Sequence, residues 1–437
     1  MTERKNPTTQ GQGTAWRLAF LLFLVNSLSF VDRQILTLLV EPIRADLEIS
    51  DTQISLLQGI AFASFYALLG LPLGRLADRT DRPRLIAVGI GIWSVMTAVS
   101  GLARDYAHLF LARMGVAVGE AALSPAAVSL LSDRFPRNRV ARAIGLFQSG
   151  IFVGSALALL AGGWLLAWLG DTVHLPVVGV IAGWRVVFTV IGLPGLIFSL
   201  AMFLVDEPRR QAAGAAPAQL PLRQGLAWLW ARRGVYGPHF VAFTAITVLA
   251  YGTLAWAPTV LVRVHGLTPA EAGVRLGTMM LVMGPLGVFG SGWLVDQLLA
   301  RRVADGPPLA AIGGVLLFVA SVPVFALSAQ LGVVLAAALV VAFAQSYPYG
   351  IASASLALIT PPAMRGQVTA LYLLISNLVG LSLGPLLVAL GTDYLFANDL
   401  AVGRSLALLP AITAPVALAA LVMLRRPYAA SWREVSE

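Results

Sequence analysis

Long apolar runs recur along the whole chain of 437 residues, and no other feature limits its folding so strongly. A helix of about 20 apolar residues crosses the hydrocarbon core of a bilayer, which is about 30 Å thick. Only 12% of the residues are charged and 58% are hydrophobic, which is too little charge to cover a soluble protein of this size. The sequence therefore predicts an all-α polytopic membrane protein with twelve transmembrane helices. The predicted spans are residues 16–40, 53–76, 84–103, 107–131, 140–169, 182–204, 236–262, 270–299, 309–328, 331–359, 366–391 and 402–424.

The net charge of +9 follows the predicted topology. Arginines gather in every second connection, as at Arg134, Arg139 and Arg142, whereas the alternate connections hold few. This positive-inside pattern predicts that both termini lie in the cytoplasm, with the chain in a bacterial inner membrane. Because the basic residues serve topology, we expect no nucleic-acid partner.

The residue types that are missing exclude several classes of function. The chain has no cysteine, its four histidines lack metal-ligand spacing, and its sole lysine is Lys5 in the N-terminal tail. A nucleotide-binding loop needs a lysine after a glycine-rich turn, so none is expected. We therefore expect no cofactor, no metal site and no enzymatic activity. Transport would have to be driven by gradients, in a channel or a secondary transporter.

The two halves of the chain repeat a motif. G-R-L-A-D (Gly74 to Asp78) ends the second predicted span and G-W-L-V-D (Gly292 to Asp296) ends the eighth. Six spans in each half predict parallel repeats. We expect an N-terminal bundle over residues 1–205, a cytoplasmic linker over 206–235 and a C-terminal bundle over 236–437. The end of the linker is either a short amphipathic helix on the membrane surface or an extension of the seventh span.

The motif in the first half, G-R-L-A-D-R-T-D-R-P-R, resembles the signature between the second and third helices of the major facilitator superfamily, from which it departs at Asp81 and Pro83. The resemblance implies two six-helix bundles that rock about a central site, with a gate on the cytoplasmic side. Asp78 would latch that gate through a helix dipole and loop arginines. The gate residues implied are Gly74, Asp78, Arg79, Arg82 and Asp296.

Two further stretches resemble the spinster-like family of lysolipid and sphingolipid transporters. They are F-V-D-R-Q-I-L (Phe30 to Leu36) and R-M-G-V-A-V-G-E-A-A-L-S-P-A (Arg113 to Ala126). This resemblance implies an amphipathic substrate. It does not transfer a particular substrate to this chain.

Four ionisable residues fall inside predicted spans of the first half: Asp32, Arg33, Arg113 and Glu120. Helix rise puts Asp32 and Arg113 each about 10 Å below the outer surface, so we expect one buried cluster. Charges at such depth are costly. The cluster is either a structural ion-pair network or a relay in which Asp32 and Glu120 carry protons and Arg33 and Arg113 pair with them or with the substrate.

The second half carries almost no mid-span charge. Its expected cavity residues are Tyr251, Trp256, Met283, Gln345, Tyr347 and Asn377. A site with one charged and one apolar half suits an amphipathic molecule. The leading hypothesis is a monomeric, proton-coupled transporter that moves lipid-like or organic anionic substrates by alternating access. Its expected partners are the substrate, protons and the surrounding membrane lipids. A multidrug or small organic-acid transporter and, in another class, a lipid scramblase or channel are the alternatives.

Overall fold

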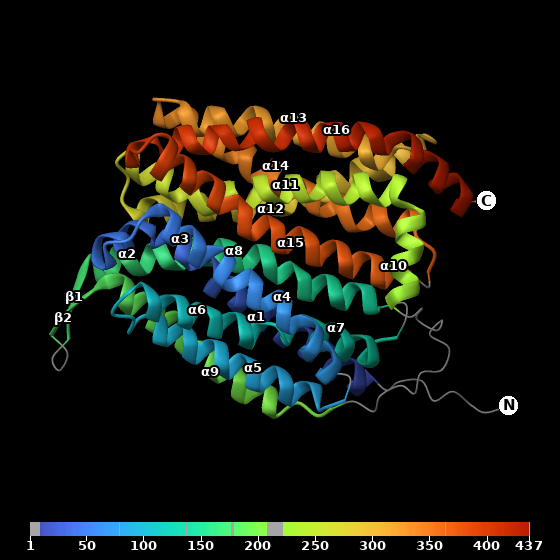
Figure 1. Ribbon diagram of the computed structural model, residues 1–437. Coiled ribbons are helices and arrows are strands. Elements are labelled where there is room, and N and C mark those ends of the chain that lie inside the picture. Colours follow the sequence, from blue (N-terminus) through green and yellow to red (C-terminus); the bar gives the residue numbers. More distant parts are fainter. Residues whose placement is uncertain are drawn as a thin grey trace. The chain divides into compact units, whose positions relative to one another are not determined.

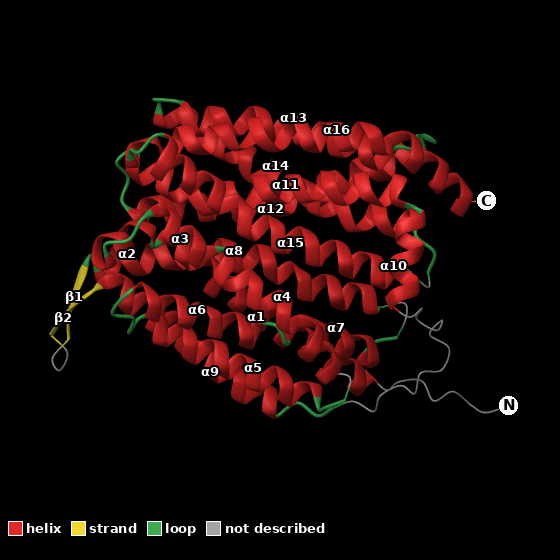
Figure 2. Ribbon diagram, in the orientation of Figure 1, coloured by secondary structure: helices red, strands yellow, loops and turns green. Residues whose placement is uncertain are grey.

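The computed structural model describes residues 9–77, 79–136, 139–175, 179–207, 222–362 and 364–436, and nearly all of them are helical (Figure 2). Within these residues, 12 helical segments are long and apolar enough to cross a membrane. This confirms the predicted all-α polytopic fold. The segments are Gly13–Leu38, Asp51–Gly70, Arg82–Ser100, Tyr106–Arg134, Arg142–Leu169, Gly183–Phe203, Arg233–Arg263, Pro269–Ala300, Gly306–Leu327, Leu331–Ile359, Arg365–Leu395 and Asp399–Val435.

The chain divides into two compact units, here called unit 1 (Met1–Leu36 and Ser64–Ala212) and unit 2 (Thr37–Ala63 and Ala213–Glu437). Most or all of each of the following elements belongs to unit 1: α1 (Thr9–Leu38), α4 (Ile60–Ala77), α5 (Arg82–Ser100), α6 (Tyr106–Glu120), α7 (Leu123–Arg134), α8 (Val140–Leu169), β1 (Thr172–Leu175), β2 (Gly179–Ala182) and α9 (Gly183–Phe203). The boundaries 1–205, 206–235 and 236–437 expected from the sequence stay a prediction.

Unit 2 contains α2 (Val40–Leu47), α3 (Asp51–Gln58), α10 (Leu222–Ala231), α11 (Arg233–Arg263), α12 (Pro269–Ala300), α13 (Gly306–Leu327), α14 (Leu331–Ile359), α15 (Arg365–Leu390), the π-helix η1 (Gly391–Leu395), the 3₁₀ helix η2 (Asp399–Ala401) and α16 (Val402–Ser436).

Glycines let the helices of unit 1 approach closely. In Figure 1, α5 and α9 run side by side, and α5 also packs on α6. A Cβ added at Gly119 would lie 2.6 Å from the carbonyl oxygen of Gly89, and one at Gly154 would collide with the carbonyl oxygen of Ser27. Small residues at such crossings are typical of membrane helices, where van der Waals packing drives association. A short antiparallel hairpin of β1 and β2 precedes α9.

The core of unit 2 is apolar and aromatic. Phe243, Val315, Leu356, Tyr372 and Tyr428 belong to one buried cluster drawn from α11, α13, α14, α15 and α16. In Figure 1, α13 and α16 lie next to each other along their length. Large apolar side chains also remain exposed, among them Phe289 (76% exposed). A surface of this kind is expected where lipid takes the place of water.

The segment Thr37–Ala63, here called the strap, packs with unit 2, although the chain on either side of it belongs to unit 1. It holds α2 and α3. A capping box starts α3, because the Ser50 hydroxyl accepts from the Gln53 backbone N–H (3.2 Å) and the Gln53 side chain accepts from the Ser50 N–H (2.9 Å). The strap therefore has its own well-defined helix start.

A separate helix, α10, precedes α11. The backbone leaves helical geometry at Arg232 (φ −107°, ψ 23°), and Figure 1 shows α10 turned across the direction of α11. Trp230 is 72% exposed and Leu226 46%. The structure thus has α10 and α11 as two helices joined at Arg232. The placement of α10 on a membrane surface stays a prediction.

Candidate functional site

The fourth span is interrupted next to a buried acid. Helix α6 ends at Glu120 and α7 begins at Leu123. Pro125 explains the break, because its ring would clash with the carbonyl of Ala121, four residues earlier, and it has no N–H to donate. The interruption places Glu120 at the end of a helix in the middle of a span.

Glu120 pairs with two residues of α1. Its Oε2 atom lies 2.5 Å from the Nε of Arg33 and accepts a hydrogen bond from the Ser29 hydroxyl (2.8 Å). The guanidinium of Arg33 also lies over the rings of Phe30 and Tyr66, 4.7 and 4.9 Å from their centroids. These contacts fix Arg33 between a carboxylate and two aromatic faces.

Asp32 and Arg113 meet in a different way. The Nη1 of Arg113 donates to the backbone carbonyl of Asp32 (3.0 Å), and neither carboxylate oxygen of Asp32 has a hydrogen-bond partner within the described residues. The Thr97 hydroxyl lies beside that carboxylate, in a contact that falls short of a standard hydrogen bond. The sequence predicted that these four charges gather. It did not show that Arg33 pairs with Glu120 while the Asp32 carboxylate stays unpaired.

The cluster is largely buried, and its positive and negative charges are equal in number. Asp32, Arg113 and Glu120 are each 1% exposed, and the Arg33 side chain is 19% exposed. Two acids and two bases sum to zero charge when all are ionised. A buried carboxylate without hydrogen bonds favours its neutral form, since burial penalises charge, whereas a nearby guanidinium favours the ionised form.

The six expected cavity residues fall into two groups. Trp256 is fully buried and donates its indole N–H to the carbonyl of Pro385 (2.9 Å), so it packs between helices and does not line an open surface. Tyr347 (7% exposed) and Gln345 (9%) are also buried. Tyr251 donates to Asn377 (3.1 Å), which is exposed. Met283 is half-buried.

The signature residues of the predicted gate are only partly described. Asp78 lies outside the described residues, Arg79 and Asp296 are exposed, and Gly74 has room for a Cβ. Arg82 is 2% exposed. It donates to Glu207 (2.7 Å), Asp133 (2.6 Å) and Ser129 (2.9 Å).

Arg82 is therefore the centre of an ion-pair network in unit 1. Sequence reasoning missed Asp133 and Glu207 as its partners, because they lie 51 and 125 residues away.

A second ionic network, also missed, fastens the strap within unit 2. Arg263 at the end of α11 is nearly buried and forms a two-bond fork with Asp51 (2.6 and 2.7 Å) and a bond with Glu41 (2.7 Å). Arg44 contacts Asp51 (3.2 Å) and Asp399 (3.1 Å).

A fourth carboxylate, that of Asp393, holds the start of α3. Asp393 accepts from the backbone N–H and the hydroxyl of Thr52 (2.7 and 2.6 Å), where the helix dipole favours an anion. The signal in the sequence was the presence of single arginines among acids in the connections with little positive charge.

The acids of this network are close enough to suggest a metal site. One oxygen each of Asp51, Asp393 and Asp399 lies within 4.8 Å of the others. Arg263 and Arg44 already neutralise Asp51 and Asp399, however. The donor set is therefore arranged around guanidinium groups.

The described residues hold twelve segments long and apolar enough to span a membrane, and charged side chains are buried within one unit. Charges inside a membrane mark pathways for solutes and protons, so this combination is typical of membrane transporters. The family model of the Major Facilitator Superfamily matches residues 22–385. The chain belongs to this superfamily, and it is a membrane transporter.

Individual relatives agree with this assignment. An MFS-type efflux pump of Mycolicibacterium smegmatis is 32% identical over 413 residues, 92% of this chain and 90% of that protein. Protein spinster homolog 1 of Mus musculus is 28% identical over 412 residues, 89% of this chain and 75% of that protein. The crystal structure of a bacterial homolog to the human lysosomal transporter Spinster superposes with a TM-score of 0.80 at 26% identity, covering 99% of this chain and 98% of that one. The resemblance to spinster proteins seen in the sequence is confirmed.

Proposed function

We propose that this transporter moves an amphipathic lipid-like or organic anionic substrate by alternating access, driven by coupled proton movement. One observation carries the proposal: the Asp32 carboxylate is buried without a standard hydrogen bond to any described residue, with only the weak contact of Thr97, beside the Arg33–Glu120 ion pair and Arg113. A purely structural network would be expected to satisfy every buried carboxylate, because a buried polar group without a partner is costly.

Competition between substrate and acids would supply the coupling. When a guanidinium turns to an anionic headgroup, the neighbouring carboxylate loses its favourable charge and takes up a proton. Arg33 is the most accessible of the four groups, so it is the first candidate for headgroup contact. Asp32 and Glu120 are the proposed proton carriers.

The strap is the segment that a movement between the two units would have to deform. Because it packs with unit 2 while its flanks belong to unit 1, a change in the relative position of the units must bend the chain near Leu36 and Ala63 or release the ion pairs of Arg263. We propose that these pairs form a releasable fastening. The residues of the signature, including Asp78, are proposed to latch the cytoplasmic gate.

The test of coupling uses Asp32→Asn in reconstituted vesicles. The variant imitates the permanently protonated acid, so uptake driven by a pH gradient should collapse while substrate exchange at equal pH persists in part. Glu434→Gln, at an exposed acid of α16, is the matched control and should change neither. Loss of both transport modes together with thermal stability would instead identify the cluster as a structural clamp.

A second candidate is efflux of drug-like or small organic-acid molecules, favoured by the 32% identity to the mycobacterial efflux pump. Thermal stabilisation of the purified protein by lysolipids, sphingoid lipids and organic anions separates the two. Counterflow without leak excludes a scramblase or channel. We further propose that the chain lies in a bacterial inner membrane with both termini in the cytoplasm, on the basis of its arginine distribution. We also propose that it works as a monomer.

A further inference from the structure

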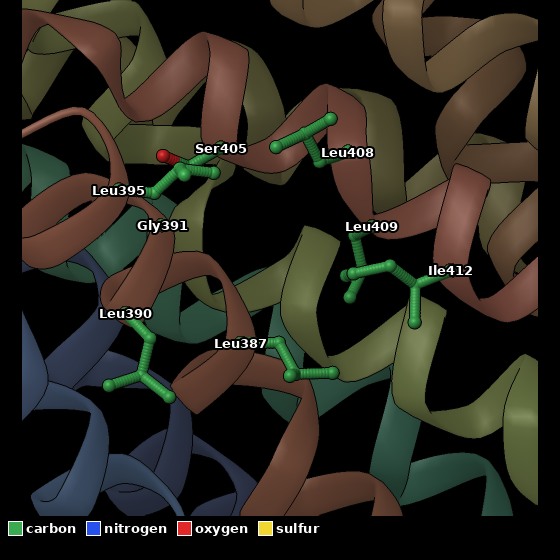
Figure 3. Close-up of a pocket in the computed structure, with 8 residues that line it drawn as sticks. All are labelled: Leu387, Leu390, Gly391, Leu395, Ser405, Leu408, Leu409 and Ile412. Carbon is green, nitrogen blue, oxygen red and sulfur yellow. The ribbon is translucent and has the colours of Figure 1, made fainter.

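An apolar pocket of about 230 Å³ lies between the end of α15 and the start of α16 (Figure 3). Leu387, Leu390, Leu395, Leu408 and Ile412 contribute most of its wall. The pocket lies wholly within unit 2 and includes none of the residues proposed above for proton or substrate handling.

The wall offers little to a polar ligand. Its one polar side chain, Ser405, accepts a hydrogen bond from the Thr392 hydroxyl (3.0 Å), which takes up part of its hydrogen-bonding capacity. The adjoining turn is the π-helix η1, closed by a bond from the Phe396 N–H to the Gly391 carbonyl (2.9 Å). Such turns are rare, and in other proteins they frequently occur at functional sites. The chemistry of the wall points to an alkyl chain.

The pocket opens on a surface that would face lipid. Leu390 and Leu408 are each 38% exposed, Ile412 54% and Leu395 67%, and all four belong to segments apolar enough to span a membrane. An occupant would therefore reach the pocket from the bilayer. A volume of about 230 Å³ has room for several methylene groups of a chain.

A positive charge lies at the edge of the pocket, one turn before Leu408 on the same helix face. Arg404, Leu408 and Ile412 are four residues apart and form one stripe on α16. Arg404 is exposed, and no ion pair or hydrogen bond of its side chain is found among the described residues. Tyr394, in the η1 turn that contacts α16, is 72% exposed. Arginine and tyrosine above an apolar stretch are typical of the level of lipid headgroups.

We propose that this pocket binds one acyl chain of a membrane phospholipid whose phosphate is held by Arg404. The charge of the guanidinium matches a phosphate, with which arginine forms two-pronged hydrogen bonds. The apolar stripe of Leu408 and Ile412 matches the acyl chain. Head and tail contacts then lie in the order in which a bilayer lipid presents them.

The test measures lipid binding to the delipidated full-length protein in detergent by native mass spectrometry, with a long-chain phosphatidylglycerol as the probe. Leu408→Trp and Ile412→Trp fill the pocket and should abolish the tightest binding event. Arg404→Gln should weaken that event by about tenfold or more, the loss of one charge-assisted contact. Val422→Trp, on exposed α16 surface outside the pocket, should bind lipid as the unchanged protein does.

Several outcomes would overturn the proposal. Equal binding by all variants, or equal loss with Val422→Trp, would mean that lipid binds only as a general annulus. Binding of free glycerol phosphate as tight as that of the phospholipid would mean that Arg404 alone holds an anion and the pocket takes no chain. Melting temperatures show whether a tryptophan variant has lost its fold, and Arg404→Gln, at an exposed position, remains informative in that case.

Discussion

Removing Arg263 should release the strap. In Arg263→Ala, the two-bond fork to Asp51 and the bond to Glu41 are lost, and Asp51 remains with no exposed surface. The only other guanidinium in contact with Asp51 among the described residues is that of Arg44, 3.2 Å away. The strap then keeps the contacts of Arg44 with Asp399 and of Thr52 with Asp393.

The structure sets the size of the effect. Removing one partner of a buried ion pair costs about 3–5 kcal/mol, because the remaining charge is uncompensated. Since Arg44 still contacts Asp51, we expect the lower end of that range. A loss of about 3 kcal/mol corresponds to a shift of about 150-fold in the equilibrium between fastened and released strap.

Cysteine labelling measures that equilibrium directly, because the chain has no native cysteine. Ile54 in α3 is fully buried, so Ile54→Cys should react with a maleimide only when the strap is released. Arg263→Ala should speed the reaction strongly, and Arg263→Lys, which keeps the charge but not the fork, should lie between. Arg301→Ala, at an exposed arginine of unit 2, is the control. A lower melting temperature with unchanged labelling would refute a releasable strap.

Three further predictions concern unit 1 and the signature motif. Arg113→Ala should weaken binding of anionic substrates about 10- to 150-fold relative to neutral analogues with the same apolar tail, measured by thermal shift; equal weakening would assign Arg113 a structural role. Asp78→Asn should reduce counterflow more than Asp296→Asn, because the full signature surrounds only Asp78, and two equal, negligible effects would contradict the latch. Gly154→Ala should destabilise the protein by about 1–3 kcal/mol, since the new Cβ meets the backbone of Ser27; an unchanged melting temperature would show that the helices move apart freely.

The sequence alone was enough to predict that this chain folds in a lipid bilayer and to indicate its family. Twelve apolar runs were readable because spanning a bilayer requires a fixed length of apolar helix, and this requirement is local. The gathering of Asp32 with Arg113 was readable for a similar reason, since helix rise converts position in a span into depth. The glycines of α8 and the proline after Glu120 likewise have local effects on helix geometry and packing.

Tertiary structure alone decided which groups meet. Depth from helix rise does not give the rotation of each helix, so the sequence left open that Arg33 faces Glu120 while Arg113 donates to the backbone carbonyl of Asp32. The rotation of α11 also decided that Trp256 is fully buried between helices. Arg82 finds its partner Glu207 125 residues away, and Arg263 finds Asp51 212 residues away. Such pairs depend on how helices distant in the chain pack together, and one sequence read by itself carries no local signal of that packing.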